Sequence, residues 1–238
     1  MALNLVMIGP PGAGKGTQAG LICRQYGIPK ISTGDMLREA VAEGSALGRA
    51  VKDVIGAGRL VDDEAIIAVV RDRLKKADAQ AGFVLDGFPR TVAQARALDD
   101  MLVDRSPLVV VVFEVPEREL MRRLTWRRVC GECGATYGGV DVPELTGDRR
   151  EGPVESGRCR KCGGALTQRA DDNDSVVRDR LAVFTNQTAP LVDFYSGRPT
   201  FSLVNGLQDP EHVTEDLTRA IEAALELSTT DGPGRGRA

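Results

Sequence analysis

A glycine-rich segment near the start of the chain has the residue types that bind phosphate. An apolar run, Leu3–Ile8, leads into Gly9–Gln18, where Gly9, Gly14 and Lys15 have the spacing of a phosphate-binding loop. The glycines allow successive N–H groups to face one anion, and a helix that begins near Lys15 adds the positive end of its dipole. We therefore expect a bound nucleoside polyphosphate. The alternative is a glycine turn without a ligand.

The position after Lys15 departs from the general pattern of these loops. It is Gly16, and the hydroxyl group comes one residue later, at Thr17. A Ser or Thr directly after the lysine is often a Mg²⁺ ligand, so that role is not assigned to this position. Asp86 is another candidate, because it ends the short apolar run Gly82–Asp86 and parallel strands place ligands at their carboxyl ends.

Arginines recur in the segments that could surround such a ligand. Six of them are candidates for phosphate binding: Arg38, Arg90, Arg123, Arg127, Arg169 and Arg180. A guanidinium group offers a fork of donors that matches phosphate oxygens. Arg123 and Arg127 are four residues apart on a predicted helix, where two like charges are unfavourable unless an anion lies near them. For each segment the alternative is a solvated face or a helix cap with no ligand.

Two C-x-x-C pairs form a second chemical signal, made by Cys130, Cys133, Cys159 and Cys162. Each pair is followed by a glycine, as in zinc-ribbon turns. Reduced thiols favour a metal over a disulfide, and four thiolates make a closed tetrahedral site for structural Zn²⁺. Zinc would stabilise a segment that has too few apolar residues for a core. Free thiols, labile disulfides and another metal are the alternatives.

Alternation of apolar runs with helix-like segments predicts a parallel sheet covered by helices. The expected strands cover 3–8, 29–32, 82–86, 108–115 and 200–204. The expected helices cover 15–26, 34–43, 46–57, 62–77, 91–101, 117–128, 174–187 and 210–227. Residues 32–61 and 129–170 break this alternation and are interpreted as inserts. Residues 228–238 lack apolar side chains and are expected to be disordered.

Composition limits the classes of function. The chain has 238 residues, a formal net charge of −3 and 42% hydrophobic residues, which suits one domain with inserts and a real core. The weak negative charge argues against nucleic acid or an anionic membrane as a partner. No apolar run reaches the roughly twenty residues of a membrane span, and no signal segment opens the sequence. We expect a cytoplasmic protein.

Together these segments resemble the adenylate kinase family, in its long-lid bacterial form with a four-cysteine lid. The resemblance covers about residues 3–227 and is carried by Gly9–Gln18, Ser32–Arg38, Arg59–Val61, Asp86–Arg90 with Gln94, Arg127–Val129 and Gln168–Asn173. It implies an α/β P-loop kinase fold with a five-stranded parallel sheet flanked by helices. It also implies a core over 1–31, 62–125 and 173–227, a helical insert for the nucleoside monophosphate over 32–61, and a small zinc-ribbon-like lid over 126–172.

The resemblance implies a monomeric enzyme that catalyses the reversible, Mg²⁺-dependent reaction ATP + AMP = 2 ADP. The catalytic residues would be Lys15, Asp86, Arg90, Arg127, Arg169 and Arg180. ATP would be bound by Gly12, Ala13, Gly14, Lys15, Gly16, Thr17, Arg123, Arg127, Thr136, Tyr137 and Gln208. AMP would be bound by Thr33, Arg38, Arg59, Leu60, Val61, Gly87, Phe88, Pro89, Arg90, Gln94, Arg169 and Arg180. The four cysteines would hold structural zinc.

Two alternatives to this function remain at the level of sequence. One is a different nucleoside monophosphate kinase, which acts on UMP or CMP or uses GTP; the other is a non-catalytic nucleotide-binding protein on the same scaffold. The cysteine lid and Gln94 favour ATP and AMP. Gln94 is also a candidate partner of Thr91 in a helix capping box, and we favour its contact with adenine. The resemblance is weakest over 138–158, where Gly138 replaces the histidine of the family.

Overall fold

The centre of the molecule is a parallel β-sheet. The computed structural model describes residues 2–105, 107–138 and 157–230. Its larger sheet has five strands in the order β2-β3-β1-β4-β8, and all neighbouring pairs are parallel. The strands are β1 (Leu3–Ile8), β2 (Lys30–Ser32), β3 (Gly82–Asp86), β4 (Leu108–Glu114) and β8 (Phe201–Asn205). The α/β class and the five-stranded parallel sheet expected from the sequence are confirmed.

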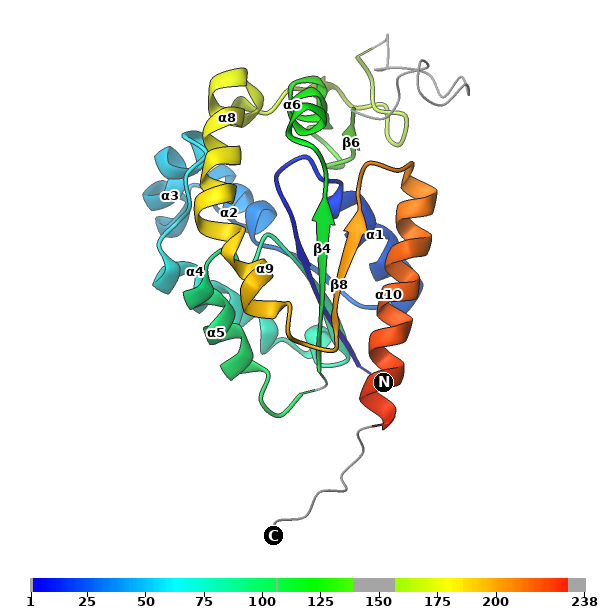
Figure 1. Ribbon diagram of the computed structural model, residues 1–238. Coiled ribbons are helices and arrows are strands. Elements are labelled where there is room, and N and C mark those ends of the chain that lie inside the picture. Colours follow the sequence, from blue (N-terminus) through cyan, green and yellow to red (C-terminus); the bar gives the residue numbers. More distant parts are fainter. Residues whose placement is uncertain (1, 106, 139–156, 231–238) are drawn as a thin grey trace.

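Helices cover both faces of this sheet (Figure 1). One face packs against α1 (Lys15–Tyr26), α6 (Glu117–Trp126), α8 (Asp174–Val183) and α10 (Pro210–Thr230). The other packs against α4 (Asp63–Leu74), α5 (Val92–Met101) and α9 (Pro190–Tyr195). In the described part of the chain, no helix combines the length and hydropathy needed to span a bilayer.

The largely apolar sequence of the central strands follows from this double cover. Successive side chains of a strand point to opposite faces. In β1, Leu5 and Met7 belong to the core on one face, whereas Val6 and Ile8 belong to the core on the other. Both faces are therefore dry, and polar alternation would place unpaired polar groups in a core.

The insert between β2 and β3 contains a pair of short helices, α2 (Thr33–Ala42) and α3 (Ala46–Gly56). The Ser32 hydroxyl caps α2 by accepting from the Asp35 amide at 3.3 Å. The helices cross at Gly48, where an added Cβ would lie 1.9 Å from the Ala40 carbonyl oxygen. Only glycine fits this crossing, which fixes the direction of α3.

The second insert contains a small antiparallel sheet with the order β6-β5-β7. Its strands are β5 (Arg128–Cys130), β6 (Thr136–Tyr137) and β7 (Leu166–Thr167), followed by the 3₁₀ turn η2 (Ala170–Asp172). The strands were not predicted, because two- and three-residue strands carry no periodic signal. Figure 1 places β6 and α6 at the end of the molecule toward which β4 and β8 point.

Four helices differ from the sequence prediction by two residues or more at one end. The helix expected over 117–128 ends at Trp126, and Arg128 already belongs to β5. The helix expected over 174–187 becomes the π-helix η3 (Phe184–Thr188) after α8, and the unpredicted α9 begins at Pro190, whose ring and missing N–H disturb an α-helix. The helix expected over 62–77 ends at Leu74 and is followed by the turn η1 (Ala77–Ala79). The last helix continues to Thr230, beyond the expected limit, and the rest of the expected tail lies outside the described residues.

Candidate nucleotide-binding site

The phosphate-binding loop connects β1 to α1 at the carboxyl edge of the sheet. Gly14 is the N-cap of α1 and has a φ of 93°, a left-handed conformation that glycine adopts without a steric penalty. The Lys15 ammonium folds back over the loop and donates to the carbonyl oxygens of Gly9 at 2.7 Å and Pro10 at 2.8 Å. The helix start and the ammonium therefore present positive charge at the same place.

Buried cations surround this loop. Burial lowers the pKa of Lys15 to about 8, and the charge of Asp86 opposes this shift. Burial is also the main cause of the lowered pKa values of Arg90 and Arg180. The pKa of Arg169 falls to about 10 through burial and the charges of neighbouring arginines. Such crowding of partly desolvated cations marks a site that an anion would stabilise.

A cavity of about 600 Å³ opens above the phosphate-binding loop. Residues of the loop, of the end of β3, of α6, of α8 and of the segment before α10 line it. Ten of the eleven residues predicted for ATP are among them: Gly12, Ala13, Gly14, Lys15, Gly16, Thr17, Arg123, Arg127, Thr136 and Gln208. The sequence motifs therefore converge on one cavity, although they are spread over most of the chain.

A second cavity of about 80 Å³ lies between the helical insert and the sheet. Nine of the residues predicted for AMP line it: Thr33, Arg38, Arg59, Leu60, Val61, Gly87, Arg90, Gln94 and Arg180. Arg38, Arg90 and Arg180 also line the larger cavity. The two cavities therefore adjoin, and these arginines lie at their junction.

Four predicted residues are placed differently. Pro89 and Arg169 line the larger cavity and are not among the residues that line the smaller one. Phe88 is only 1% exposed and belongs to the core. The Tyr137 hydroxyl lies 3.2 Å from the Cys159 sulfur, so the side chain is directed at the cysteine cluster. Sequence motifs specify a segment, but which side chains of the segment face the cavity depends on the backbone.

Gln94 is held by two sets of hydrogen bonds. Its carbonyl oxygen accepts from the Arg90 amide at 2.7 Å, and its amide donates to Asp63 at 2.7 Å. Asp63 also accepts from the Thr91 hydroxyl at 2.8 Å. Thr91 caps α5 as predicted, but the reciprocal bond goes to Arg90, so the capping box is half formed. The sequence did not reveal the role of Asp63, because its partners are about thirty residues away.

Protein carboxylates balance Arg123 and Arg127. The expected helix is corrected here, because α6 ends at Trp126 and Arg127 follows it as the C-cap residue. The Glu119 carboxylate accepts from Arg123 Nε at 2.7 Å. The fully buried Asp172 accepts from Arg127 Nε at 2.7 Å and from Arg180 Nη1 at 3.1 Å. These two carboxylates supply the anions that the sequence led us to expect near the arginines, and they hold Arg123 and Arg127 in place. Asp172 also ties the start of the small sheet to α8.

Asp86 ends β3 between two strand neighbours, Met7 of β1 and Ser32 of β2. Its Oδ2 atom lies 3.5 Å from Lys30 Nζ, and both residues line the larger cavity. Next to it, the Gly87 carbonyl accepts from the Thr33 hydroxyl and from Arg90 Nε, each at 2.8 Å. This carbonyl links α2 to the segment after β3. An anionic oxygen donor thus stands beside the phosphate-binding loop.

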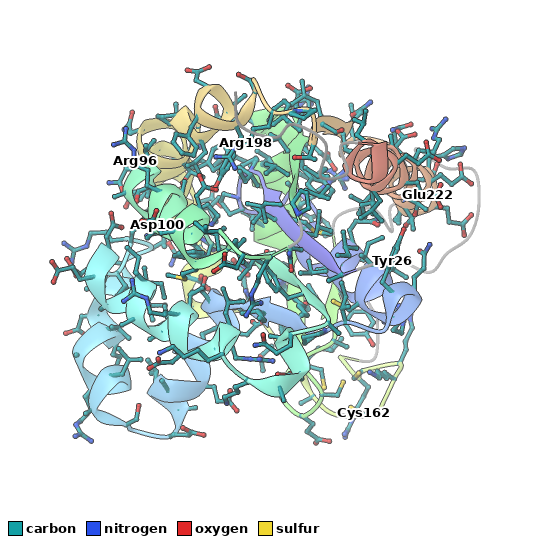
Figure 2. All side chains as sticks on the ribbon, turned by 90° about the horizontal axis from the view of Figure 1, so that it is seen from below. Tyr26, Arg96, Asp100, Cys162, Arg198 and Glu222 are labelled. Atoms are coloured by element: carbon teal, nitrogen blue, oxygen red, sulfur yellow. The ribbon has the colours of Figure 1, made fainter. Side chains whose placement is uncertain are left out.

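The four predicted metal-binding cysteines form one cluster. All their sulfur atoms lie within 4.8 Å of one another, and the pairs Cys130–Cys162 and Cys133–Cys159 are each 3.5 Å apart. Tetrahedral zinc with sulfur ligands at about 2.3 Å requires sulfurs roughly 3.8 Å apart. The four sulfur atoms and their spacing therefore suit a metal ion. Figure 2 shows Cys162 at the periphery of the molecule, away from Arg198.

Sheet and loop together establish the class of protein. Parallel α/β sheets bind their ligands at the carboxyl ends of the strands, and a loop that wraps a lysine there binds nucleotide phosphates. The chain is thus an α/β protein of the P-loop class.

Comparison with known proteins narrows the class to a family. The family model described as adenylate kinase matches residues 7–199. The adenylate kinase of Archaeoglobus fulgidus is 47% identical over 226 residues, which are 94% of this chain and 98% of that protein. The adenylate kinase of a Geobacillus species is 51% identical over 221 residues (92% and 98%), and that of Symbiobacterium thermophilum is 45% identical over 224 residues (93% and 100%). The chain belongs to the adenylate kinase family, as its motifs predicted.

Proposed function

We propose that this enzyme transfers the terminal phosphoryl group of ATP to AMP and produces two molecules of ADP, reversibly. The observation that carries the proposal is the pair of adjoining cavities with Arg38, Arg90 and Arg180 at their junction. One cavity has the size and the phosphate-binding loop for a nucleoside triphosphate. The other is smaller and is lined by the segments that the motifs associate with a monophosphate.

The donor side of the reaction is assigned to the larger cavity. Backbone N–H groups of the loop and the Lys15 ammonium would bind the phosphates of ATP. Arg123 and Arg127 are held by protein carboxylates in orientations that face the cavity, so they need little reorganisation when a phosphate arrives. Gln208 and Thr136 line the same cavity from opposite parts of the chain.

The acceptor side is assigned to the smaller cavity. The three consecutive residues Arg59–Val61 and the paired α2 and α3 would enclose AMP. Asp63 and Arg90 fix the orientation of the Gln94 amide, and an amide has donors and an acceptor that match the edge of adenine. A rigid amide of this kind favours one base over others. This assignment explains why AMP is proposed over UMP or CMP.

Phosphoryl transfer needs alignment and positive charge more than covalent assistance. An oxygen of the AMP phosphate would attack the terminal phosphorus of ATP, and the bond from that phosphorus to the bridging oxygen of ADP would break. The attacking phosphate is already an anion, so no general base is required. Lys15, Arg90, Arg127, Arg169 and Arg180 would stabilise the charge that spreads over the transferred group.

Mg²⁺ is the cofactor that we propose for the donor nucleotide. Asp86 fits this role, because its carboxylate lies at the cavity beside the phosphate-binding loop. When bound with ATP, Mg²⁺ supplies charge neutralisation for the phosphates. The position of Asp86 at the end of a buried strand holds its carboxylate in a fixed direction.

The cysteine cluster is proposed to hold a structural Zn²⁺ ion. The ligand set is closed, so zinc would fold the lid and would not take part in transfer. The lid would exclude water from the larger cavity and so prevent hydrolysis of ATP. We also propose that the enzyme acts as a cytoplasmic monomer, because one chain lines both cavities and because four reduced thiolates suit a reducing compartment.

A coupled assay for ADP tests the proposal. Purified protein is mixed with ATP or GTP and with AMP, UMP or CMP, each with and without Mg²⁺. We expect rapid ADP formation from ATP, AMP and Mg²⁺, and much less product from the other combinations. Product formed with UMP or CMP as the acceptor, but not with AMP, would support a different monophosphate kinase. Nucleotide binding without product would support a non-catalytic protein.

Replacement of Lys15 tests the assignment of the phosphate-binding loop. We expect Lys15→Met to lower kcat by about 100- to 1,000-fold, because a donor aimed at developing charge is lost. The melting temperature should change little, since the ammonium is bonded to loop carbonyls and does not support the core. The control is Lys75→Met, which removes an exposed lysine paired with Asp72. Near-normal turnover of Lys15→Met would contradict the assignment.

A further inference from the structure

Lys30 is a cation of the larger cavity to which the proposed reaction assigns no direct role. It is the first residue of β2, and 29% of its side chain is exposed. Its Nζ atom lies 3.5 Å from Asp86 Oδ2 and 3.7 Å from Asp35 Oδ2. One ammonium group therefore stands between two carboxylates that come from different elements, β3 and α2. By contrast, the exposed ion pair between Lys75 and Asp72 joins two residues at the end of one helix, α4.

Gly16 identifies the place that this ammonium occupies. A Cβ atom added to Gly16 would lie 3.5 Å from Lys30 Nζ and 3.5 Å from Asp86 Oδ2. In the general phosphate-binding loop, a Ser or Thr at this position contributes its hydroxyl to Mg²⁺. The Lys30 ammonium is thus located beside Asp86 in the region where other loops of this class bind their metal ion.

We propose that Lys30 keeps free divalent cations out of the site until a nucleotide brings them in. A unit positive charge about 4 Å from a carboxylate offsets much of the attraction of that carboxylate for a second cation. Lys30 therefore offsets the negative charge of the Asp86 carboxylate when the site contains no nucleotide. Lys30 is a positioning residue, because it acts through Asp86 and does not contact the reacting atoms. This inference rests on the proposed function, since it concerns Mg²⁺ at the same site.

Binding of Mn²⁺ to the nucleotide-free protein tests the role of Lys30. Mn²⁺ replaces Mg²⁺ as an oxygen-preferring probe whose free form is measured by electron paramagnetic resonance. We expect Lys30→Gln to bind Mn²⁺ about tenfold more tightly than the unaltered protein. Lys30→Arg keeps the charge and should resemble the unaltered protein, as should the surface control Lys75→Gln. Melting curves of all four proteins show whether the fold is retained.

Equal Mn²⁺ affinity in Lys30→Gln and the unaltered protein, or no binding to either, would overturn the proposal. A second readout is the Mg²⁺ concentration that gives half-maximal turnover at fixed ATP, which should fall in Lys30→Gln and stay unchanged in Lys75→Gln. The two proposals fail separately. If Lys30→Gln shifts the Mn²⁺ affinity but the unaltered protein forms no ADP from ATP and AMP, the role of Lys30 is supported and the proposed reaction is contradicted.

Discussion

The central sheet and the lid are stabilised by different physical means. The sheet core buries aliphatic and aromatic side chains on both faces, and Leu5, Val111 and Phe83 are completely inaccessible to solvent. In the described part of the lid, 128–137 and 157–172, the buried residues are two cysteines, a glycine and an aspartate: Cys130, Cys159, Gly164 and Asp172. Hydrophobic burial therefore accounts for the core, whereas the described lid residues depend on the cysteine cluster and on ion pairs.

This difference shows how one chain can combine a stable central sheet with a lid that unfolds independently. Hydrophobic burial is distributed over many residues and tolerates local change. A metal cluster and a buried ion pair each concentrate stability in a few atoms, so the loss of one group affects the entire element. We therefore expect that unfolding of the lid leaves the sheet folded.

The largest expected effect follows removal of the metal. Cys130→Ser, or treatment of the unaltered protein with a strong chelator, should unfold the lid, because binding of structural zinc contributes roughly 10 kcal/mol to folding of small zinc modules. The core transition in differential scanning calorimetry should change little. Limited proteolysis should cut within 126–172 and leave the rest intact, and elemental analysis of the unaltered protein should find one zinc per chain.

The matched control for the metal prediction lies in the core. Leu5→Ala should cost about 2–5 kcal/mol of unfolding free energy through loss of contacts and an incompletely filled cavity. Its zinc content should remain the same as that of the unaltered protein. Simultaneous loss of the core transition and of zinc in Cys130→Ser would show that the two regions are not independent.

The next effect concerns the buried carboxylate that joins the lid to α8. Asp172→Asn leaves Arg127 and Arg180 without their shared anion and should cost about 3–5 kcal/mol. Hydrogen exchange over 166–183 measures this loss locally. The control is Asp99→Asn, which breaks another Arg–Asp pair, with Arg198, that is about one-third exposed on each side. We expect at most about 1 kcal/mol there, and equal costs at the two pairs would contradict the role of burial.

The smallest effect concerns Gly138, which directly follows β6. Its φ is +120°, and an added Cβ would lie 2.9 Å from the Trp126 carbonyl oxygen. Gly138→Ala should cost about 1–3 kcal/mol of lid stability and raise the KM for ATP. The control Gly157→Ala also has positive φ, +62°, but its Cβ would meet no atom of the described residues within 4 Å. A larger effect at Gly157 than at Gly138 would show that the close approach does not matter.

Much of the fold was predictable because the core is simple in physical terms. A strand segment that is dry on both faces must be apolar throughout, and residues 108–113 of β4 have this property. The lid strands were not predictable, because β6 and β7 have two residues each and depend on the pairing of distant segments. The π-helix was also not predicted; it continues directly from α8 and ends two residues before Pro190.

The candidate site was predictable where chemistry is written in short motifs. The phosphate-binding loop and the cysteine pairs specify their neighbours through local spacing. The contacts of Asp63, Asp172 and Lys30 were not predicted, although Asp172 lies in a segment that carries the resemblance, because their partners are supplied by other elements. Tyr137 shows the reverse case, since its segment belongs to the small sheet beside the cysteine pairs and its side chain points to the Cys159 sulfur.

The crowded cations at the junction of the cavities make the empty protein less stable than the loaded one. The pKa values of four cations at the site are lowered, namely those of Lys15, Arg90, Arg169 and Arg180. The burial and mutual repulsion of these charges therefore destabilise the folded state when no ligand is bound. A bound polyanion removes this repulsion and stabilises the folded state by about 2.7 kcal/mol at a concentration one hundred times its Kd. The lifetime of the protein against proteases therefore increases with the supply of its own substrates.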